Sequence, residues 1–311
     1  MMLRRLAILA ALMGVCVALC ACGSTNDEAL RASLAALRSP PPPPSSAPDP
    51  KVNCAHLTWS LRPTGRPGPS VQAIRRRGRL RAGVDQNTLL LGYANPLHGQ
   101  RMEGFEIDLL REISRALFGR PDRVDFHALT TAERRSAVQD GTVDIVADAY
   151  TITCYRKTQV DFSTVYLQAG QRVLVPSDSH ARSVGDLRGK RVCATQTSTS
   201  IAALKRYPGV IPYPVAQRTD CLVALQRGEV EAITSDDAIL RGFAAQDPYT
   251  KLIGPAIEPE PYGMAISKRR PDLVRFVNHA LARMRADGTW ERLYRKWLPG
   301  TPRRPPVHYT D

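Results

Sequence analysis

Residues 137–144 read Ala-Val-Gln-Asp-Gly-Thr-Val-Asp, and residues 224–231 read Ala-Leu-Gln-Arg-Gly-Glu-Val-Glu. Each stretch is typical of a helix end, a glycine suited to a left-handed cap, and the start of a buried strand. Polar loops follow both strands, at residues 150–153 and 235–237. The repeat predicts two similar lobes whose strand ends meet at one cleft, where α/β sheets bind ligands. A likeness over eight positions can also arise by chance.

Strand and helix patterns alternate outward from this repeat, which is typical of an α/β protein. Residues 105–118 predict an amphipathic helix, because apolar residues recur there at helical spacing and Gly119 and Pro121 follow. We expect strands over residues 80–84, 143–147, 191–194 and 230–234. Two closing helices are predicted over residues 273–284 and 289–298.

The amino terminus has the pattern of an export signal. Arg4 and Arg5 precede an apolar stretch, and residues 19–23 read Leu-Cys-Ala-Cys-Gly. This resembles the bacterial lipobox, which implies removal of residues 1–21 as a lipoprotein signal peptide and acylation of Cys22. An ordinary secretory signal is the alternative. Residues 22–70 contain a proline run, which predicts a stiff, extended tether. No later apolar run reaches the ~20 residues of a membrane helix, so we expect the protein at the extracytoplasmic face of the cell membrane.

Four cysteines remain after Cys22, an even number in an oxidising compartment, so disulfides are expected. Cys193 and Cys221 fall within one apparent lobe, which favours the pairs Cys193–Cys221 and Cys54–Cys154 among the three possible pairings. None of the four has metal-type spacing, and no histidine cluster accompanies them. We expect neither a metal nor a cofactor.

The formal net charge is +14. Nucleic-acid binding would gather that charge on one patch with interleaved aromatic residues. The arginines are instead scattered along the edges of apolar segments, so a solvated surface is expected and nucleic acid is not an expected partner. A position near an anionic membrane would also suit this charge.

Ordered motifs between residues 80 and 298 resemble those of the family 3 solute-binding proteins, the polar-amino-acid receptors of bacterial ABC importers. They are Gly-Phe-Glu-Ile-Asp at 104–108, Tyr-Thr-Ile-Thr-Cys-Tyr-Arg at 150–156, Val-Asp-Phe-Ser at 160–163, Asp-Leu-Arg-Gly-Lys-Arg-Val at 186–192 and Tyr-Arg-Lys-Trp-Leu at 294–298. The chain looks especially like actinobacterial glutamine- and glutamate-binding lipoproteins.

The resemblance implies an α/β periplasmic-binding-protein clamshell of type 2, with two lobes and two hinge strands. Lobe 1 would comprise residues 71–168 plus 263–298, and lobe 2 residues 173–257. The hinge strands would lie near residues 169–172 and 258–262. Residues 299–311 would form an irregular tail.

The resemblance also assigns a site for a free amino acid. Arg156 would grip the α-carboxylate, because a guanidinium binds carboxylates through two parallel hydrogen bonds, and Thr151 would assist it. Residues 196–200 match the loop whose amides receive the same carboxylate, with Ser198 and Thr199 as contacts; an N-cap role is the alternative for both. A glycine is usual in the family at position 197, where this chain has threonine.

The ammonium group would bind Asp236 and the carbonyl of Ala149. Capping of the next helix is the alternative for Asp236. Leu91 stands where the family often has an aromatic residue, and Asp85 either binds a polar side chain or ends its strand. If Asp148 faces the pocket, its charge would disfavour an acidic ligand. Strand alternation could equally turn it away.

These residues predict a monomeric receptor, not an enzyme, for an amino acid of the glutamine, glutamate, asparagine and aspartate class. The expected partners are that ligand, the lipid bilayer through Cys22, and the membrane permease of an ABC importer. A membrane sensor protein is the alternative partner, because signalling requires the same closure. A dehydratase on the same fold is a distant alternative, since no histidine or second placed carboxylate supplies general acid catalysis.

Overall fold

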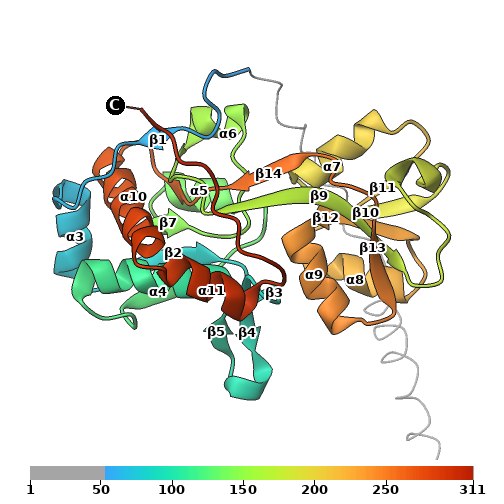
Figure 1. Ribbon diagram of the computed structural model, residues 1–311, viewed down its shortest axis with the longest axis horizontal. Coiled ribbons are helices and arrows are strands. Elements are labelled where there is room, and N and C mark those ends of the chain that lie inside the picture. Colours follow the sequence, from blue (N-terminus) through green and yellow to red (C-terminus); the bar gives the residue numbers. More distant parts are fainter. Residues whose placement is uncertain (1–52, 311) are drawn as a thin grey trace, which may run out of the picture. The chain divides into compact units, whose positions relative to one another are not determined.

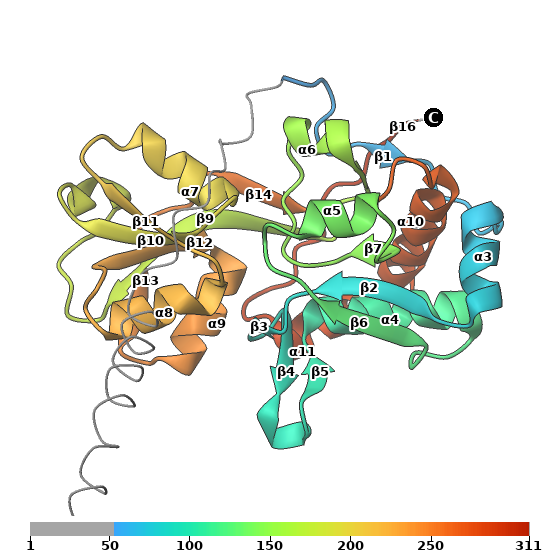
Figure 2. The same cartoon turned by 180° about the vertical axis from the view of Figure 1, so that it is seen from behind.

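A computed structural model describes residues 53–310 of the chain. The predicted signal peptide, the acylated Cys22 and most of the predicted tether lie outside these residues. Two α/β lobes make up the described part, and Figures 1 and 2 show them side by side.

The first lobe is built on a five-stranded sheet. Its order is β6 (Val124–Ala128), β2 (Leu80–Val84), β7 (Ile145–Val146), β15 (Ala265–Ile266) and β8 (Asp161–Phe162). β2 runs parallel to β6 and β7, whereas β15 is antiparallel to its neighbours. The helices packed around this sheet are α3 (Pro69–Arg77), α4 (Phe105–Phe118), α5 (Arg134–Gln139), α6 (Cys154–Gln159), α10 (Pro271–Ala286) and α11 (Thr289–Trp297).

The core of this lobe is divided between two clusters. Residues of α3, α4 and α10 pack together in the larger cluster, and α5 packs with β7 and β8 in the smaller one. α4 shows why the sequence folds this way, because its periodic apolar residues Phe105, Leu109 and Ile113 are all fully buried.

The second lobe is built on a six-stranded sheet. Its order is β11 (Ile211–Val215), β10 (Arg191–Thr195), β12 (Ala232–Asp236), β9 (Leu167–Pro176) and β13 (Thr250–Ile253), and β14 (Pro259–Tyr262) also pairs with β9. β10 is parallel to β11 and β12, and β9 is antiparallel to β12. Its helices are α7 (Thr199–Ala203), α8 (Arg218–Gln226), α9 (Asp237–Gln246) and the 3-10 turns η2 (Val184–Leu187) and η3 (Leu204–Arg206).

Two paired strands connect the lobes. β9 and β14 run antiparallel, with Gly170 opposite Pro259 and Leu167 opposite Tyr262, and Figure 1 shows both passing from one lobe to the other. They occupy the segments that the sequence predicts as hinge strands. The lobe that precedes β9 also carries a small antiparallel sheet of β3 (Asn87–Thr88), β4 (Gly92–Asn95) and β5 (Arg101–Glu103), with the turn η1 (Pro96–His98).

The carboxyl-terminal tail is less irregular than the sequence predicts. Its last described residues form β16 (Tyr309–Thr310), which pairs in parallel with β1 (Ser60–Leu61). The tail therefore docks on the segment that leads into lobe 1. The strand predicted over 143–147 is present as the shorter β7, and the strand predicted over 230–234 is shifted towards the carboxyl terminus, to β12.

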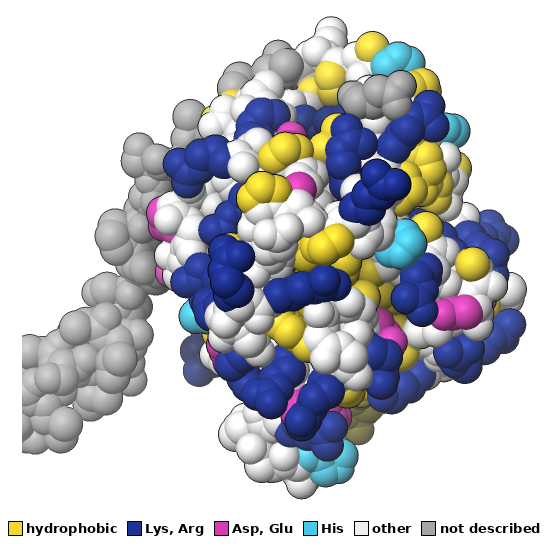
Figure 3. Space-filling model, turned by 90° about the vertical axis from the view of Figure 1, so that its left-hand side faces the viewer, with side chains coloured by type: hydrophobic (Ala, Val, Ile, Leu, Met, Phe, Trp, Pro, Cys, Tyr) yellow, Lys and Arg dark blue, Asp and Glu magenta, His cyan; other side chains and the backbone are white. Residues whose placement is uncertain are grey.

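Figure 3 views the end of the molecule that carries α3. On this face, lysine and arginine side chains are spread widely rather than gathered in one patch. Within residues 53–310, no helix has both the length and the apolar character needed to span a membrane.

Candidate functional site

A pocket lined by residues of both lobes lies where their strand ends meet. Lobe 1 contributes residues after β6 and β7, and lobe 2 contributes the ends of β10 and β12 and the starts of α7 and α8. The lining residues are Thr131, Arg134, Ala149, Thr151, Arg156, Thr195, Ser198, Thr199, Ser200, Arg218, Ser235, Asp236 and Ile239.

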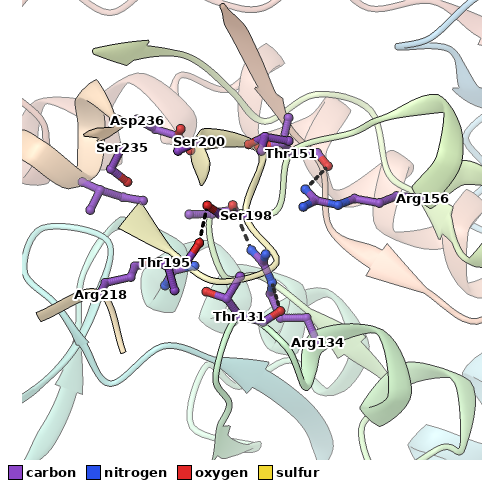
Figure 4. Close-up of a pocket in the computed structure, with 13 residues that line it drawn as sticks. Thr131, Arg134, Thr151, Arg156, Thr195, Ser198, Ser200, Arg218, Ser235 and Asp236 are labelled. Carbon is purple, nitrogen blue, oxygen red and sulfur yellow. Dashed lines mark hydrogen bonds between the residues drawn. The ribbon is translucent and has the colours of Figure 1, made fainter. Parts of the chain in front are cut away.

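Arg156 lies at one side of this pocket (Figure 4). It belongs to α6, which begins after the N-cap Thr153, and its side chain is buried. Nη1 donates to the carbonyl of Thr151 at 3.0 Å, and Nη2 donates to the carbonyl of Thr197 at 3.3 Å, in the other lobe. The guanidinium also lies over the ring of Tyr150. Arg156 is therefore held rigidly against a wall that both lobes form.

Asp236 supplies a negative charge from the end of β12. It occupies the N-cap position of α9 but makes no capping hydrogen bond, so the capping alternative does not describe it. The hydroxyl of Tyr262 donates to Oδ2 at 2.5 Å, and Oδ1 is buried without a hydrogen-bond partner among the described residues. Burial raises the pKa of this carboxyl. One carboxylate oxygen at the pocket is thus able to accept a hydrogen bond from a ligand.

Glu260 is buried next to the pocket without lining it, and it was not among the predicted site residues. Burial, and then the charge of Asp236, raise its pKa to about 8. Thr199 donates to Oε2 at 3.0 Å. Glu260 thus links the first residue of α7 to β14, the second connecting strand.

The loop between β10 and α7 forms the wall in lobe 2. Ser198 caps α7, since its hydroxyl oxygen accepts from the Ile201 amide at 3.1 Å and donates to the Thr195 carbonyl at 2.6 Å. The capping alternative therefore holds for the Ser198 hydroxyl, although the residue also lines the pocket. Thr197 has a φ of 59°. The chain thus keeps, with threonine, a left-handed backbone that glycine adopts without strain.

Ala149 is held at the pocket by its neighbours, with a φ of 44°. Its amide donates to Oε1 of Glu106 at 2.7 Å, and its carbonyl accepts from Nη1 of Arg134 at 3.2 Å. Burial, and then the charge of Asp148, raise the pKa of Glu106 to about 7. Because Arg134 already uses the carbonyl of Ala149, that carbonyl has one acceptor position left for the predicted ammonium contact.

Asp85 and Asp148 do not line the pocket themselves. Both contact Arg218, the first residue of α8, which does line it. Nη1 of Arg218 pairs with the carboxylate of Asp85 and donates to Oδ1 of Asp148 at 2.6 Å, and all three side chains are at most 7% exposed. Burial acts to lower the pKa of Arg218, but the carboxylates of Asp148 and Asp85 outweigh it and raise that pKa.

The structure does not bring Leu91 to the pocket. Its side chain is fully buried in the core of lobe 1, where the Leu91 carbonyl accepts from the Glu106 amide at 3.0 Å. Thr131 and Arg134 are the lobe 1 residues that sequence reasoning missed, and Arg218 is the main omission in lobe 2. A first helical residue carrying a long charged side chain usually faces solvent, so the sequence offered no signal for the two arginines.

Both predicted disulfides are present. Cys54–Cys154 joins the start of the described chain to α6, and Cys193–Cys221 joins β10 to α8. No group of three or more potential metal-ligating side chains occurs within residues 53–310.

The pocket places opposite charges at separate positions. In Figure 4, Arg156 lies on the side away from Asp236 and Arg218. A small zwitterion would match this arrangement, because a guanidinium binds a carboxylate and a carboxylate binds an ammonium group. Each lobe supplies one of the two charges, so such a ligand contacts both only when the lobes are together.

Comparison with known proteins agrees with this geometry. Residues 80–300 match the family described as bacterial extracellular solute-binding proteins, family 3. The glutamine-binding protein GlnH of Bacillus subtilis is 34% identical over 235 residues, which cover 75% of this chain and 86% of the relative. The glutamate-binding protein GluB of Corynebacterium efficiens is 29% identical, covering 72% of this chain and 80% of the relative.

Solved structures show the same fold. An ancestral arginine-binding protein bound to glutamine is 33% identical, with a TM-score of 0.67, and covers 71% of this chain and 98% of that one. An ancestral amino-acid-binding protein that preceded cyclohexadienyl dehydratase is 30% identical, with a TM-score of 0.68, covering 74% of this chain and all of that one. With these likenesses and a family match that spans more than two thirds of its length, the chain belongs to the bacterial extracellular solute-binding proteins of family 3.

Proposed function

We propose that this protein is a lipid-anchored extracytoplasmic receptor that closes its two lobes around one free polar amino acid and delivers it to an ABC importer. The ligand belongs to the class of glutamine, glutamate, asparagine and aspartate. The observation that carries the proposal is the placement of two buried, opposite charges at separate positions of one pocket, Arg156 in lobe 1 and Asp236 in lobe 2. The names of the relatives GlnH and GluB support the ligand class.

The ligand stabilises the closed arrangement because it contacts both lobes only there. Its α-carboxylate lies against Arg156 and the loop before α7. Its ammonium group donates to Oδ1 of Asp236 and to the carbonyl of Ala149. Cys22 carries the acyl chains, and the proline-rich segment after it holds the two lobes away from the bilayer.

The first experiment is a thermal-shift panel of the common amino acids on the mature chain. At a fixed ligand concentration, the stabilisation of the folded protein grows with the logarithm of the ratio of ligand concentration to Kd, so members of the proposed class should raise Tm most. Calorimetry then measures their Kd values. A panel in which no amino acid raises Tm would reject the proposal.

Arg156→Ala is the variant that tests the site. Removal of one partner of a buried charge pair costs about 2–5 kcal/mol, which corresponds to a loss of affinity of roughly 30-fold to several thousand-fold. Arg227→Ala is the matched control, since Arg227 is exposed and pairs only weakly with Glu229 at 3.8 Å. Near-normal affinity in Arg156→Ala, with a cooperative melt, would contradict the site.

Two alternative outputs use the same scaffold. A membrane sensor would read the same closure, and uptake of labelled ligand by cells with and without the gene separates import from sensing. A dehydratase would act on a bound carboxylate and would not need the ammonium site. Release of product from a bound ligand, followed by mass spectrometry, would favour this second alternative.

A further inference from the structure

Arg218 forms a bridge between the lobes at the wall of the pocket. It begins α8 in lobe 2, whereas its partners Asp85 and Asp148 lie after β2 and β7 in lobe 1. Besides its contacts with both carboxylates, its Nη2 donates to the carbonyl of Asp148 at 3.2 Å. Thr88 also donates to Oδ2 of Asp85 at 2.8 Å. The bridge is thus buried, and several hydrogen bonds fix its position.

The formal charges of the buried groups at this bridge are balanced. Arg218 faces two carboxylates, and the second positive charge comes from the buried Arg134. That guanidinium donates to the carbonyls of Thr131 and Asp148 at 3.1 and 2.9 Å, and lies 4.2 Å from the centre of the Tyr150 ring. Two arginines therefore offset two aspartates. In a buried site, any further charge is poorly screened.

The side chain of a bound amino acid would lie next to the bridge that Arg218 forms with Asp85 and Asp148. Arg156 and Asp236 take the carboxylate and ammonium groups, an assignment that rests on the proposed function. Arg218 lies away from Arg156 in Figure 4, with Thr195 beside it. Thr131, Thr195 and Arg218 are among the lining residues that neither of these groups occupies, and they would line space for the side chain.

We infer that the bridge of Arg218 with Asp85 and Asp148 sets ligand specificity by selecting a neutral carboxamide side chain over the matching carboxylate. A carboxamide offers an oxygen to the guanidinium and an NH2 group to acceptors beside it, and it leaves the balance of charge unchanged. A carboxylate would be a third anion around Arg218. A cationic side chain would meet two arginines.

The test compares the matched ligands glutamine and glutamate, and asparagine and aspartate, by calorimetry on the mature chain at one pH and ionic strength. The wild-type protein should bind its carboxamide at least tenfold more tightly than the matching acid. Asp148→Asn removes one negative charge at nearly constant shape. In this variant, the affinity for the acid relative to the matching amide should rise at least tenfold.

Asp85→Asn removes the other carboxylate charge and should shift the ratio in the same direction. If one of the two variants fails to fold, the other still tests the inference.

The double variant Arg218→Gln with Asp148→Asn is the charge-matched control. It disturbs the same bridge without changing its net charge, and it should weaken both ligands while leaving their ratio within about threefold of the wild-type value.

Two results would overturn the inference. One is a wild-type protein that binds an acidic amino acid as tightly as the matching amide. The other is an unchanged ratio in Asp148→Asn or Asp85→Asn. In both results the protein still binds amino acids, so the proposed function stands. Failure of every amino acid to bind would instead reject the proposed function itself.

Discussion

Single residues at the pocket are held in states that they would avoid in a free chain. Ala149 and Thr197 have positive φ angles of 44° and 59°, which cost a residue with a Cβ atom roughly 1–2 kcal/mol. The hydroxyl of Thr197 is also buried without a hydrogen-bond partner among the described residues. Such strain persists because surrounding contacts fix the backbone. Here the Ala149 amide donates to Glu106, and Arg156 donates to the Thr197 carbonyl.

Glu260 predicts how stability depends on pH. Its pKa is about 8 in the folded protein, against an ordinary value of 4.5. Between these values the folded state keeps a proton that the unfolded chain releases, so stability falls as pH rises through this window. Glu260→Gln removes this pH dependence. Between pH 5 and pH 9, the free energy of unfolding of the variant should rise relative to that of the wild type by on the order of 2–5 kcal/mol.

Chemical denaturation at both pH values, without added amino acid, measures the change. Glu258→Gln serves as the control, because Glu258 lies on the same segment but is 44% exposed and pairs with Arg206. A difference between Glu260→Gln and the wild type that is equal at the two pH values would contradict the shifted pKa.

Elements were predicted best where periodicity determines them. α4 and α10 follow from regular apolar spacing, and α3 and α4 both end at a glycine with positive φ, Gly78 and Gly119. The short strand β7 is defined by pairing with β2 and β15, so its ends cannot be derived from its own residues. Arg218 was missed for a similar reason, because its partners Asp85 and Asp148 are 133 and 70 residues away in the chain.

The disulfide Cys193–Cys221 connects the element that carries Arg218 to the sheet. It joins β10 to α8 across 28 residues. Closing a loop of this length stabilises a fold by about 3–4 kcal/mol on the chain-entropy account. The double variant Cys193→Ala with Cys221→Ala should lower the free energy of unfolding by that amount.

Urea denaturation of the oxidised proteins measures this loss. The wild type treated with reductant should lose at least as much stability as the double variant, because the reductant also opens Cys54–Cys154. Ligand affinity should also fall in the double variant, because α8 then holds Arg218 less firmly. Equal stability of the wild type and the double variant would contradict the expected role of the bond.

The whole molecule depends on a close approach between its lobes. Gly242 lies within α9 of lobe 2, and a Cβ atom there would meet the carbonyl oxygen of Leu89, in lobe 1, at 2.4 Å. Glycine is unfavourable inside a helix by about 1 kcal/mol relative to alanine. Its presence in α9 is therefore explained by contact between the lobes rather than by the needs of the helix.

Gly242→Leu should hold the lobes apart. We expect affinity for the amino acid to fall at least tenfold, since the ligand can no longer contact both charged residues. The stability of the protein without ligand should stay the same or rise, because leucine favours the helix. Small-angle scattering with and without ligand checks the geometry. Full compaction of the variant on adding ligand would contradict this account.

The bond between Cys54 and Cys154 has a mechanical consequence. It fastens the amino-terminal end of the described chain to α6, two positions before Arg156. A pull on that end of the chain is therefore delivered to lobe 1 through α6, and β9, β14 and lobe 2 carry none of it directly. Under the proposed function, lobe 1 would then be the lobe that the amino-terminal segment holds in place. Lobe 2 would be the lobe that moves when a ligand binds.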